Sequence, residues 1–147
     1  MSEKVALRSV TAYPHVSDIQ TRWMDNDVYG HVNNVVYYSF FDTAVNRFLI
    51  EGGVLDIHEG GVIGLVVETN CRYLKPLEFP HPVRAGIAVS HIGTSSVRYE
   101  IGLFAGDAQE PAAQGHFVHV YVDRKTRRPT SLPKDFRALL ETIHLGP

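Results

Sequence analysis

The chain has 147 residues, of which 44% are hydrophobic and 20% charged, an ordinary mixture for one folded domain. We therefore expect residues 1–147 to form a single domain, and this much apolar material excludes wholesale disorder. The net charge of −2 supplies no broad positive field for a nucleic-acid backbone.

The sequence shows no disulfide framework, no secretory signal and no membrane-spanning segment. The single cysteine, Cys71, cannot form an internal disulfide and leaves no cysteine-based zinc set. The first residues, 1–15, include Glu3, Lys4 and Arg8 and lack the apolar centre of a secretory signal. No run approaches the ~18 consecutive apolar residues of a membrane span. These features predict a cytoplasmic protein that binds neither nucleic acid nor membrane.

The order of the predicted elements is strand, helix, about four strands and a short helix. The strands are expected at Val16–Trp23, Gly61–Tyr73, Val83–Ser90, Val97–Leu103 and Ala113–Asp123. Apolar residues at three- and four-residue steps predict helices over Val35–Glu51 and Lys134–His144. This order predicts an α+β fold in which one antiparallel sheet covers one long helix.

Two details refine this prediction. Asn33 or Asn34 is a candidate cap of the long helix, and Gly52-Gly53 is a natural stop. The segment Ala113–Asp123 is apolar on both faces, whereas one helix covers only one of them. The remaining apolar surface predicts a protein–protein interface and thus at least a dimer.

The densest polar cluster, Arg22–Asn34, lies where the first strand leads into the long helix. A helix start presents unpaired N–H groups and a partial positive charge, which can polarise a carbonyl. A carboxylate just upstream, from Asp25 or Asp27, can act as base or nucleophile, and the combination suits acyl transfer. These residues also have structural interpretations: both aspartates suit turns, and His31 suits a structural hydrogen bond. Asp25, Asp27 and His31 match no zinc spacing, so we expect no metal and no other cofactor.

The run Asp27–Asn34, followed by Tyr37, resembles the Asp-x-x-Gly-His-Val-Asn-Asn-x-x-Tyr signature of hotdog-fold acyl-CoA thioesterases of the 4-hydroxybenzoyl-CoA thioesterase type. Tyr73–Leu77 and Ile92–Tyr99 resemble a strand pair of the same family, and the likeness extends from residue 18 to 132. The resemblance implies a five-stranded antiparallel sheet wrapped around one long central helix. It also implies hydrolysis of acyl-CoA to a carboxylic acid and free coenzyme A, in a homodimer or homotetramer with the active site near the subunit seam.

The resemblance assigns the catalytic carboxylate to Asp27, as nucleophile or general base, because the family's glycine follows that aspartate by three residues, as Gly30 does. It implies that backbone amides from His31 to Asn34 polarise the thioester carbonyl, with Asn34 the main donor. His31 and Asn33 occupy polar positions of the motif.

The resemblance extends less specifically to substrate contacts. It suggests that substrate is bound by the motif tyrosine, the hairpin turn and the basic run after the last strand: Tyr37, Thr94, Ser95, Ser96, Arg98, Arg127 and Arg128. The basic run also suits a solvated hairpin end. Family members often carry Glu where this chain has Asp42, which leaves the role of Asp42 open. Glu68 either enters the acyl pocket or pairs with Arg72.

Two other function classes compete with the thioesterase. Dehydratases or hydratases of the same fold use other His and Asp or Glu spacings. A non-catalytic acyl-CoA-binding hotdog module, such as the effector domain of a regulator, is the main alternative. Regulators of that kind carry a pair of DNA-binding helices ahead of the hotdog domain. Here about a dozen residues precede the first predicted strand, and Asp27 has no evident purpose in a pure binder. The acyl group, and the choice between coenzyme A and a carrier protein, stay open.

Overall fold

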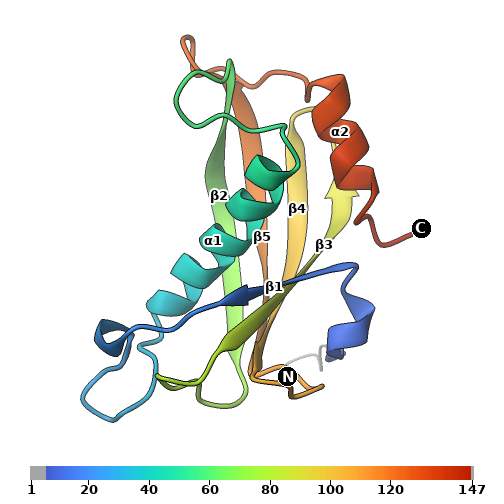
Figure 1. Cartoon of the computed structure of the whole chain (residues 1–147). Helices are drawn as coiled ribbons and strands as arrows, with labels where there is room; N and C mark the ends of the chain where they lie inside the picture. The colour runs from blue at the N-terminus through green and yellow to red at the C-terminus, as the bar shows by residue number, and fades with distance from the viewer. Residues whose placement is uncertain (1–5, 147) are drawn as a thin grey trace, which may run out of the picture.

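The computed structural model describes residues 6–146 and contains a five-stranded antiparallel sheet with a long helix packed against it (Figure 1). The strands are β1 (His15–Ile19), β2 (Val62–Tyr73), β3 (Val83–Ile92), β4 (Ser96–Ala105) and β5 (Ala113–Asp123). They pair in the order β1-β3-β4-β5-β2, so β1 and β2 are the edge strands. The α+β prediction, with one sheet covering one helix, is confirmed.

The long helix α1 (Val36–Glu51) begins one residue after the predicted start. Its buried side chains recur at three- and four-residue steps, as the apolar pattern predicted: Tyr37, Phe40, Phe41, Ala44, Val45, Phe48 and Leu49. At its start, the Asn33 Oδ1 accepts the Val35 N–H at 3.2 Å. At its end, Gly53 has a φ of +76°, a conformation that glycine adopts without strain.

The helix covers one face of the sheet, which we call the inner face. Residues 97, 99, 101 and 103 of β4 point to this face and share one core with α1, and Val97 and Tyr99 are both fully buried. Because side chains alternate along a strand, Arg98 and Glu100 point to the opposite, outer face.

The segment before β1 folds across part of the outer face. The ring of Tyr13 lies directly over two glycines: a Cβ at Gly86 would come within 2.6 Å of the ring and one at Gly102 within 2.7 Å of the hydroxyl. Glycine is therefore required at both positions by this close approach. Tyr13 forms a second small apolar cluster with Val10, Ala88 and Phe104.

Two predicted boundaries are wrong by three residues or more. The first strand, predicted over Val16–Trp23, ends at Ile19, because Trp23–Asp25 turns into a short 3₁₀ helix that the Asp25 side chain caps. The last helix, α2 (Lys134–Glu141), ends three residues before the predicted His144. Its following segment instead runs beside β3, where the Leu145 N–H donates to the Val89 carbonyl at 2.7 Å.

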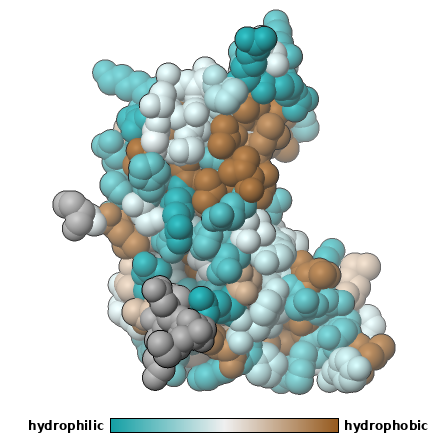
Figure 2. Space-filling model, turned by 180° about the vertical axis from the view of Figure 1, so that it is seen from behind, coloured by the Kyte–Doolittle hydropathy of each residue, from teal (hydrophilic) through white to brown (hydrophobic). Residues whose placement is uncertain are grey.

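The edge strand β2 carries unusually exposed apolar residues. Leu65, Val66 and Val67 are 41%, 49% and 59% exposed, and the β2–β5 register shifts between Val66 and Glu68. On the outer face, seen in Figure 2, apolar side chains gather in a patch toward the end of the sheet that carries the β3–β4 turn. Among the described residues no helix is both long and apolar enough to cross a membrane.

Candidate active site

A tight turn from residue 27 to 31 sets the position of the motif aspartate. The Asp27 N–H donates to the His31 carbonyl at 2.8 Å, and the Gly30 N–H donates to the Asp27 carbonyl at 3.1 Å. Gly30 has a φ of +82°, which favours glycine at this position. One carboxylate oxygen of Asp27 accepts the Tyr29 N–H at 2.8 Å. The second oxygen carries no hydrogen bond from any described residue, which leaves it available to a substrate or a water molecule.

The neighbouring aspartate has a different environment. Asp25 is 1% exposed, and its carboxylate accepts three hydrogen bonds from Arg22, from the backbone N–H and from Nε and Nη2 of the guanidinium, at 2.8–3.1 Å. Its carbonyl accepts the Asn33 N–H at 2.8 Å. The carboxylate of Asp25 is thus engaged in holding the loop together.

The backbone amides between His31 and Asn34 divide into two pairs. The Val32 N–H donates to the Leu77 carbonyl at 2.7 Å, and the Asn33 N–H to Asp25. The N–H groups of His31 and Asn34 have no acceptor among the described residues. Asn34 lies two residues before α1, whose partial positive charge is strongest at this end. Its N–H can therefore donate to a bound carbonyl oxygen.

A cleft of about 390 Å³ brings several of these groups together. It is lined by Asp27, His31, Val32, Asn34, Tyr37, Tyr73, Leu74, Lys75 and Pro76. The Tyr37 hydroxyl accepts the Leu77 N–H at 3.3 Å, and burial raises its pKa, with the Asp27 charge acting in the same direction. The hydroxyl accordingly keeps its proton at neutral pH and can donate it to a ligand in the cleft.

A second, more apolar groove lies on the other side of the turn. It is lined by Trp23, Met24, Asn26, Asp27, Val28 and Gly30. The side chains of Trp23, Met24 and Val28 are strongly exposed. Asp27 lines both hollows and so stands between a polar cleft and an apolar groove.

The expected substrate contacts fall into two groups. Tyr37 lies in the cleft with Asp27, whereas Thr94 and Ser95 of the β3–β4 turn and Ser96 at the start of β4 lie at the other end of the sheet (Figure 1). That turn packs against the segment before α2, where the Leu132 N–H donates to the Thr94 carbonyl at 3.0 Å. Arg98 lies on the outer face. A single chain therefore does not bring the turn residues or Arg98 close to its own Asp27.

The basic run after β5 also lies at that far end. Arg127 and Arg128 are exposed in the loop from Asp123 to Pro129, and Arg127 has a φ of +63°. The Arg124 side chain is occupied by the carbonyls of Ile57 and Gly60. Lys125, Arg127 and Arg128 are thus the exposed cations of this run, and their side chains have no hydrogen-bond partner among the described residues.

Two residues with open roles are placed by the structure outside the cleft. Asp42 accepts hydrogen bonds from Asn46 one turn along α1, at its carbonyl and at Oδ1. Glu68 neither enters an acyl pocket nor pairs with Arg72; its carboxylate contacts Nε2 of His116 at 2.7 Å. The bulge beside Glu68 turns its side chain toward the outer face, where His116 lies.

Among the cleft residues that carry a polar side-chain group, sequence reasoning did not select two, Tyr73 and Lys75. The Tyr73 hydroxyl donates to the Asn34 carbonyl at 3.0 Å and so ties β2 to the start of α1. The Lys75 ammonium lies 3.6 Å from the Glu110 carboxylate at the surface. Both belong to the run Tyr73–Leu77, and the only feature of the sequence that could have indicated them was the resemblance of this run to the family. Within residues 6–146 no group of three His, Cys, Asp or Glu side chains is arranged to hold a metal.

A family model described as the thioesterase-like superfamily matches residues 21–140. The chain belongs to this superfamily. The match covers the whole motif loop, α1 and every strand after it, and the family supports acyl thioester hydrolysis in general.

Solved structures share the same architecture. The PA5185 protein of Pseudomonas aeruginosa is 49% identical, with 95% of this chain and 97% of that chain covered and a TM-score of 0.92. A Thermus thermophilus thioesterase complexed with coenzyme A and Zn is 29% identical, with coverage of 90% and 95% and a TM-score of 0.74. The sheet and the packed helix are those of the hotdog fold.

A plant protein is similar over most of the chain. The chloroplastic acyl-acyl carrier protein thioesterase ATL3 of Arabidopsis thaliana is 23% identical over 126 residues, which are 84% of this chain. The matched part spans 66% of the length of the plant protein.

Proposed function

We propose that this protein is an acyl-CoA thioesterase that hydrolyses its substrate to a carboxylic acid and free coenzyme A. The observation that carries the proposal is the shared cleft of the Asp27 carboxylate and the Asn34 N–H, each with hydrogen-bonding capacity left unused by the described residues. The motif resemblance further suggests the 4-hydroxybenzoyl-CoA thioesterase type. The cytoplasmic location stays a prediction.

In the proposed reaction, the thioester carbonyl oxygen lies against the Asn34 N–H at the positive end of α1. This donor stabilises the negative charge that develops on the oxygen when the carbonyl carbon is attacked. Asp27 either attacks that carbon, forming an anhydride that water then hydrolyses, or removes a proton from the attacking water. The carbon–sulfur bond breaks in both routes, and coenzyme A leaves as a thiol after it gains a proton.

A dimer through β2 would complete the substrate site. β2 is an edge strand with unpaired backbone groups and exposed apolar side chains, which suits pairing with a second copy. In an antiparallel pair, the Val62 end of one copy's β2 adjoins the Tyr73 end of the other's. Tyr73 lines the Asp27 cleft, and Val62 pairs with Asp123, just before the basic loop.

This arrangement gives the remote basic residues a role. Pairing of two β2 strands would bring Arg127 and Arg128 of one copy toward the Asp27 cleft of the other. Two exposed guanidinium groups there would suit the phosphates of coenzyme A. The active site would then lie at the seam between subunits, and a tetramer of two such dimers is compatible with the apolar patch on the outer face.

The decisive experiment measures thiol release from a panel of thioesters. The panel contains aryl-CoA esters including 4-hydroxybenzoyl-CoA, short- and long-chain acyl-CoA, and the same acyl groups on a carrier protein. Turnover of at least one CoA ester, lost in Asp27→Asn, is the expected result. Binding of acyl-CoA without turnover would instead establish a non-catalytic module, and turnover of carrier-linked esters alone would replace coenzyme A as the substrate carrier.

A further inference from the structure

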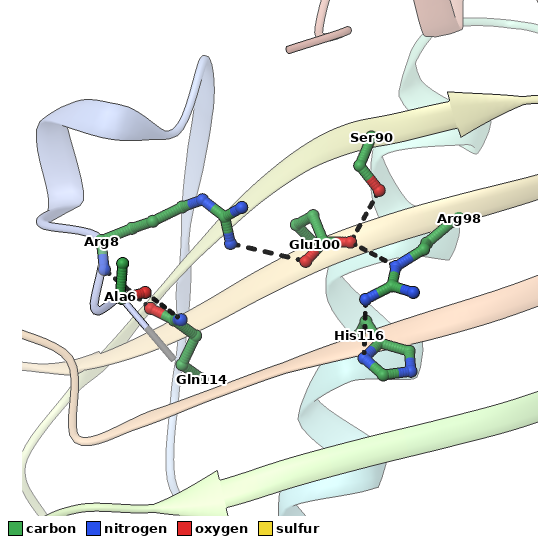
Figure 3. A network of polar contacts seen from close by, with 7 residues as sticks. All are labelled: Ala6, Arg8, Ser90, Arg98, Glu100, Gln114 and His116. Carbon is green, nitrogen blue, oxygen red and sulfur yellow. Dashed lines mark hydrogen bonds and ion pairs between the residues drawn. The ribbon is translucent and has the colours of Figure 1, made fainter. Parts of the chain in front are cut away.

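The outer face holds a polar pocket that the proposed reaction does not use. It has a volume of about 340 Å³, and its lining includes Arg8, Asn70, Arg72, Arg98, Glu100 and His116. These residues come from the N-terminal segment, β2, β4 and β5, and α1 lies behind the sheet from them (Figure 3). The pocket is therefore separated from the Asp27 cleft of its own chain by the thickness of the sheet.

A buried carboxylate organises the pocket. Glu100 is 7% exposed and accepts hydrogen bonds from Arg98 Nε at 2.7 Å, Ser90 Oγ at 2.7 Å and Arg8 Nη1 at 3.4 Å. Both of its oxygens are thus occupied by donors of the chain. Glu100 in turn fixes two guanidinium groups that approach from opposite sides in Figure 3.

Arg98 is held by a second contact. Its Nη2 lies 3.3 Å from Nδ1 of His116, and a guanidinium nitrogen can only donate, so Nδ1 is the acceptor. The ring proton of the neutral imidazole is therefore on Nε2, which donates to Glu68 at 2.7 Å. This chain of contacts holds the Arg98 fork in one orientation.

The pocket has more hydrogen-bond donors than acceptors and more positive than negative charge. Arg8, Arg72 and Arg98 line it against the single carboxylate of Glu100, and Glu68 beyond His116 offsets one further charge. The Arg72 side chain makes no hydrogen bond or ion pair with another described residue. Its guanidinium, together with the remaining N–H groups of Arg8 and Arg98, is available to an anion.

We propose that this pocket, which shares no lining residue with the Asp27 cleft, binds the phosphate group of a small organic phosphate other than coenzyme A. Three guanidinium groups reach it from three separate segments, which suits a tetrahedral phosphate with several acceptor oxygens better than a flat carboxylate. Glu100 and His116 already fix two of the three guanidinium groups, so these two arginine side chains lose little conformational freedom when a ligand binds. The pocket volume leaves space for the organic part of the ligand beside its phosphate.

Calorimetric titration with inorganic pyrophosphate, at constant pH and ionic strength, tests this site. The wild-type protein is expected to bind at sub-millimolar concentration, and Arg72→Gln to bind about tenfold more weakly because one charge-assisted contact is lost. Lys134→Gln, the matched control, removes one exposed positive charge at the start of α2 and should bind like the wild type. Asp27→Asn should also bind pyrophosphate normally, because Asp27 does not line the pocket.

The titration is repeated with coenzyme A to identify the source of the phosphate. Coenzyme A affinity and thiol release that are equal in Arg72→Gln and wild type support a separate site. Two results overturn the proposal: pyrophosphate affinity that is the same in Arg72→Gln and Lys134→Gln, or the absence of binding to wild type at millimolar concentration. Weaker coenzyme A binding in Arg72→Gln also overturns it, because the pocket would then belong to the substrate site.

Discussion

The guanidinium of Arg22 and the carboxylate of Asp25 lie 2.9 Å apart, and Asp25 is almost completely buried while the Arg22 side chain is largely exposed. Two residues further on, the Asp27 carboxylate faces a cleft and accepts one backbone N–H. The loop thus holds two carboxylates with separate environments. Asp25 has the environment of a structural residue, whereas Asp27 has an unused carboxylate oxygen, as the catalytic role that we propose for it requires.

Asp25→Asn should lower stability more than it lowers the chemical rate. The amide would present N–H groups to the Arg22 donors in place of one acceptor oxygen, leaving buried polar groups unmatched at a cost of about 1–3 kcal/mol. Because the Arg22 side chain is largely exposed, water can solvate its guanidinium in the variant, and we expect a loss of stability in the lower part of that range. Thermal melting should show a fall of several degrees, and at temperatures where the variant is folded it should retain most of kcat. A melting temperature equal to that of wild type would contradict this role.

Asp27→Asn should have the opposite profile. Its Oδ1 can still accept the Tyr29 N–H, so the turn and the melting temperature should be preserved. Asparagine is neither a useful base nor a nucleophile, and loss of a positioned base costs ~10²–10⁴-fold in rate. We expect kcat to fall by that factor with little change in KM, measured by thiol release on the best substrate of the panel. If kcat falls by the same factor in the Asp25 and Asp27 variants when both are equally folded, the assignment of Asp27 as the catalytic carboxylate fails.

Local patterns in the sequence predicted most of the fold. Apolar side chains of α1 recur at the helical period, and β5 has the bounds predicted from its apolar run. Such patterns depend on neighbours within a few residues. The contact of Tyr13 with Gly86 and Gly102 depends on three segments far apart in the chain, so no periodicity signalled that the N-terminal segment covers the outer face.

The part of the candidate site that comes from one sequence motif could be predicted. Asp27, His31, Asn34 and Tyr37 are close in sequence and share a cleft, but Tyr73 reaches it from β2 through a hydrogen bond to the Asn34 carbonyl. The pairing of Glu68 with His116 likewise depends on the register of β2 on β5 and on the bulge before Glu68. Neither contact has a signature in the sequence around either residue.

Val66→Asp should disrupt the proposed dimer. Val66 is half-exposed on the edge strand, and a carboxylate there would be desolvated and repelled by its counterpart in a β2–β2 pair. Sedimentation at micromolar concentration should show a dimer or tetramer for wild type and a smaller species for the variant, with reduced activity. Ile57→Asp places the same charge at an exposed apolar residue outside the sheet and should leave the assembly intact. A wild-type monomer with full activity would refute the interface.

Stability should fall with decreasing pH because of one buried histidine. His119 is 3% exposed on the inner face among the rings of Tyr99, Phe117 and Tyr121, and burial lowers its pKa to about 4. In the unfolded chain the pKa returns to its ordinary value near 6.5, so between these two values the unfolded state binds more protons. The stabilisation is complete above about pH 6.5 and is lost progressively down to about pH 4, by ~3 kcal/mol at most.

His119→Phe isolates this contribution. Phenylalanine fits an aromatic environment and removes both the titrating group and the buried Nε2, which has no hydrogen-bond partner among the described residues. Urea unfolding at several pH values should show a smaller decrease in the free energy of unfolding from pH 6.5 to 4 for the variant than for wild type. The slope with pH is the decisive quantity, because a change in packing would shift the variant's stability equally at every pH. Parallel curves for the two proteins would show that His119 does not carry the acid sensitivity.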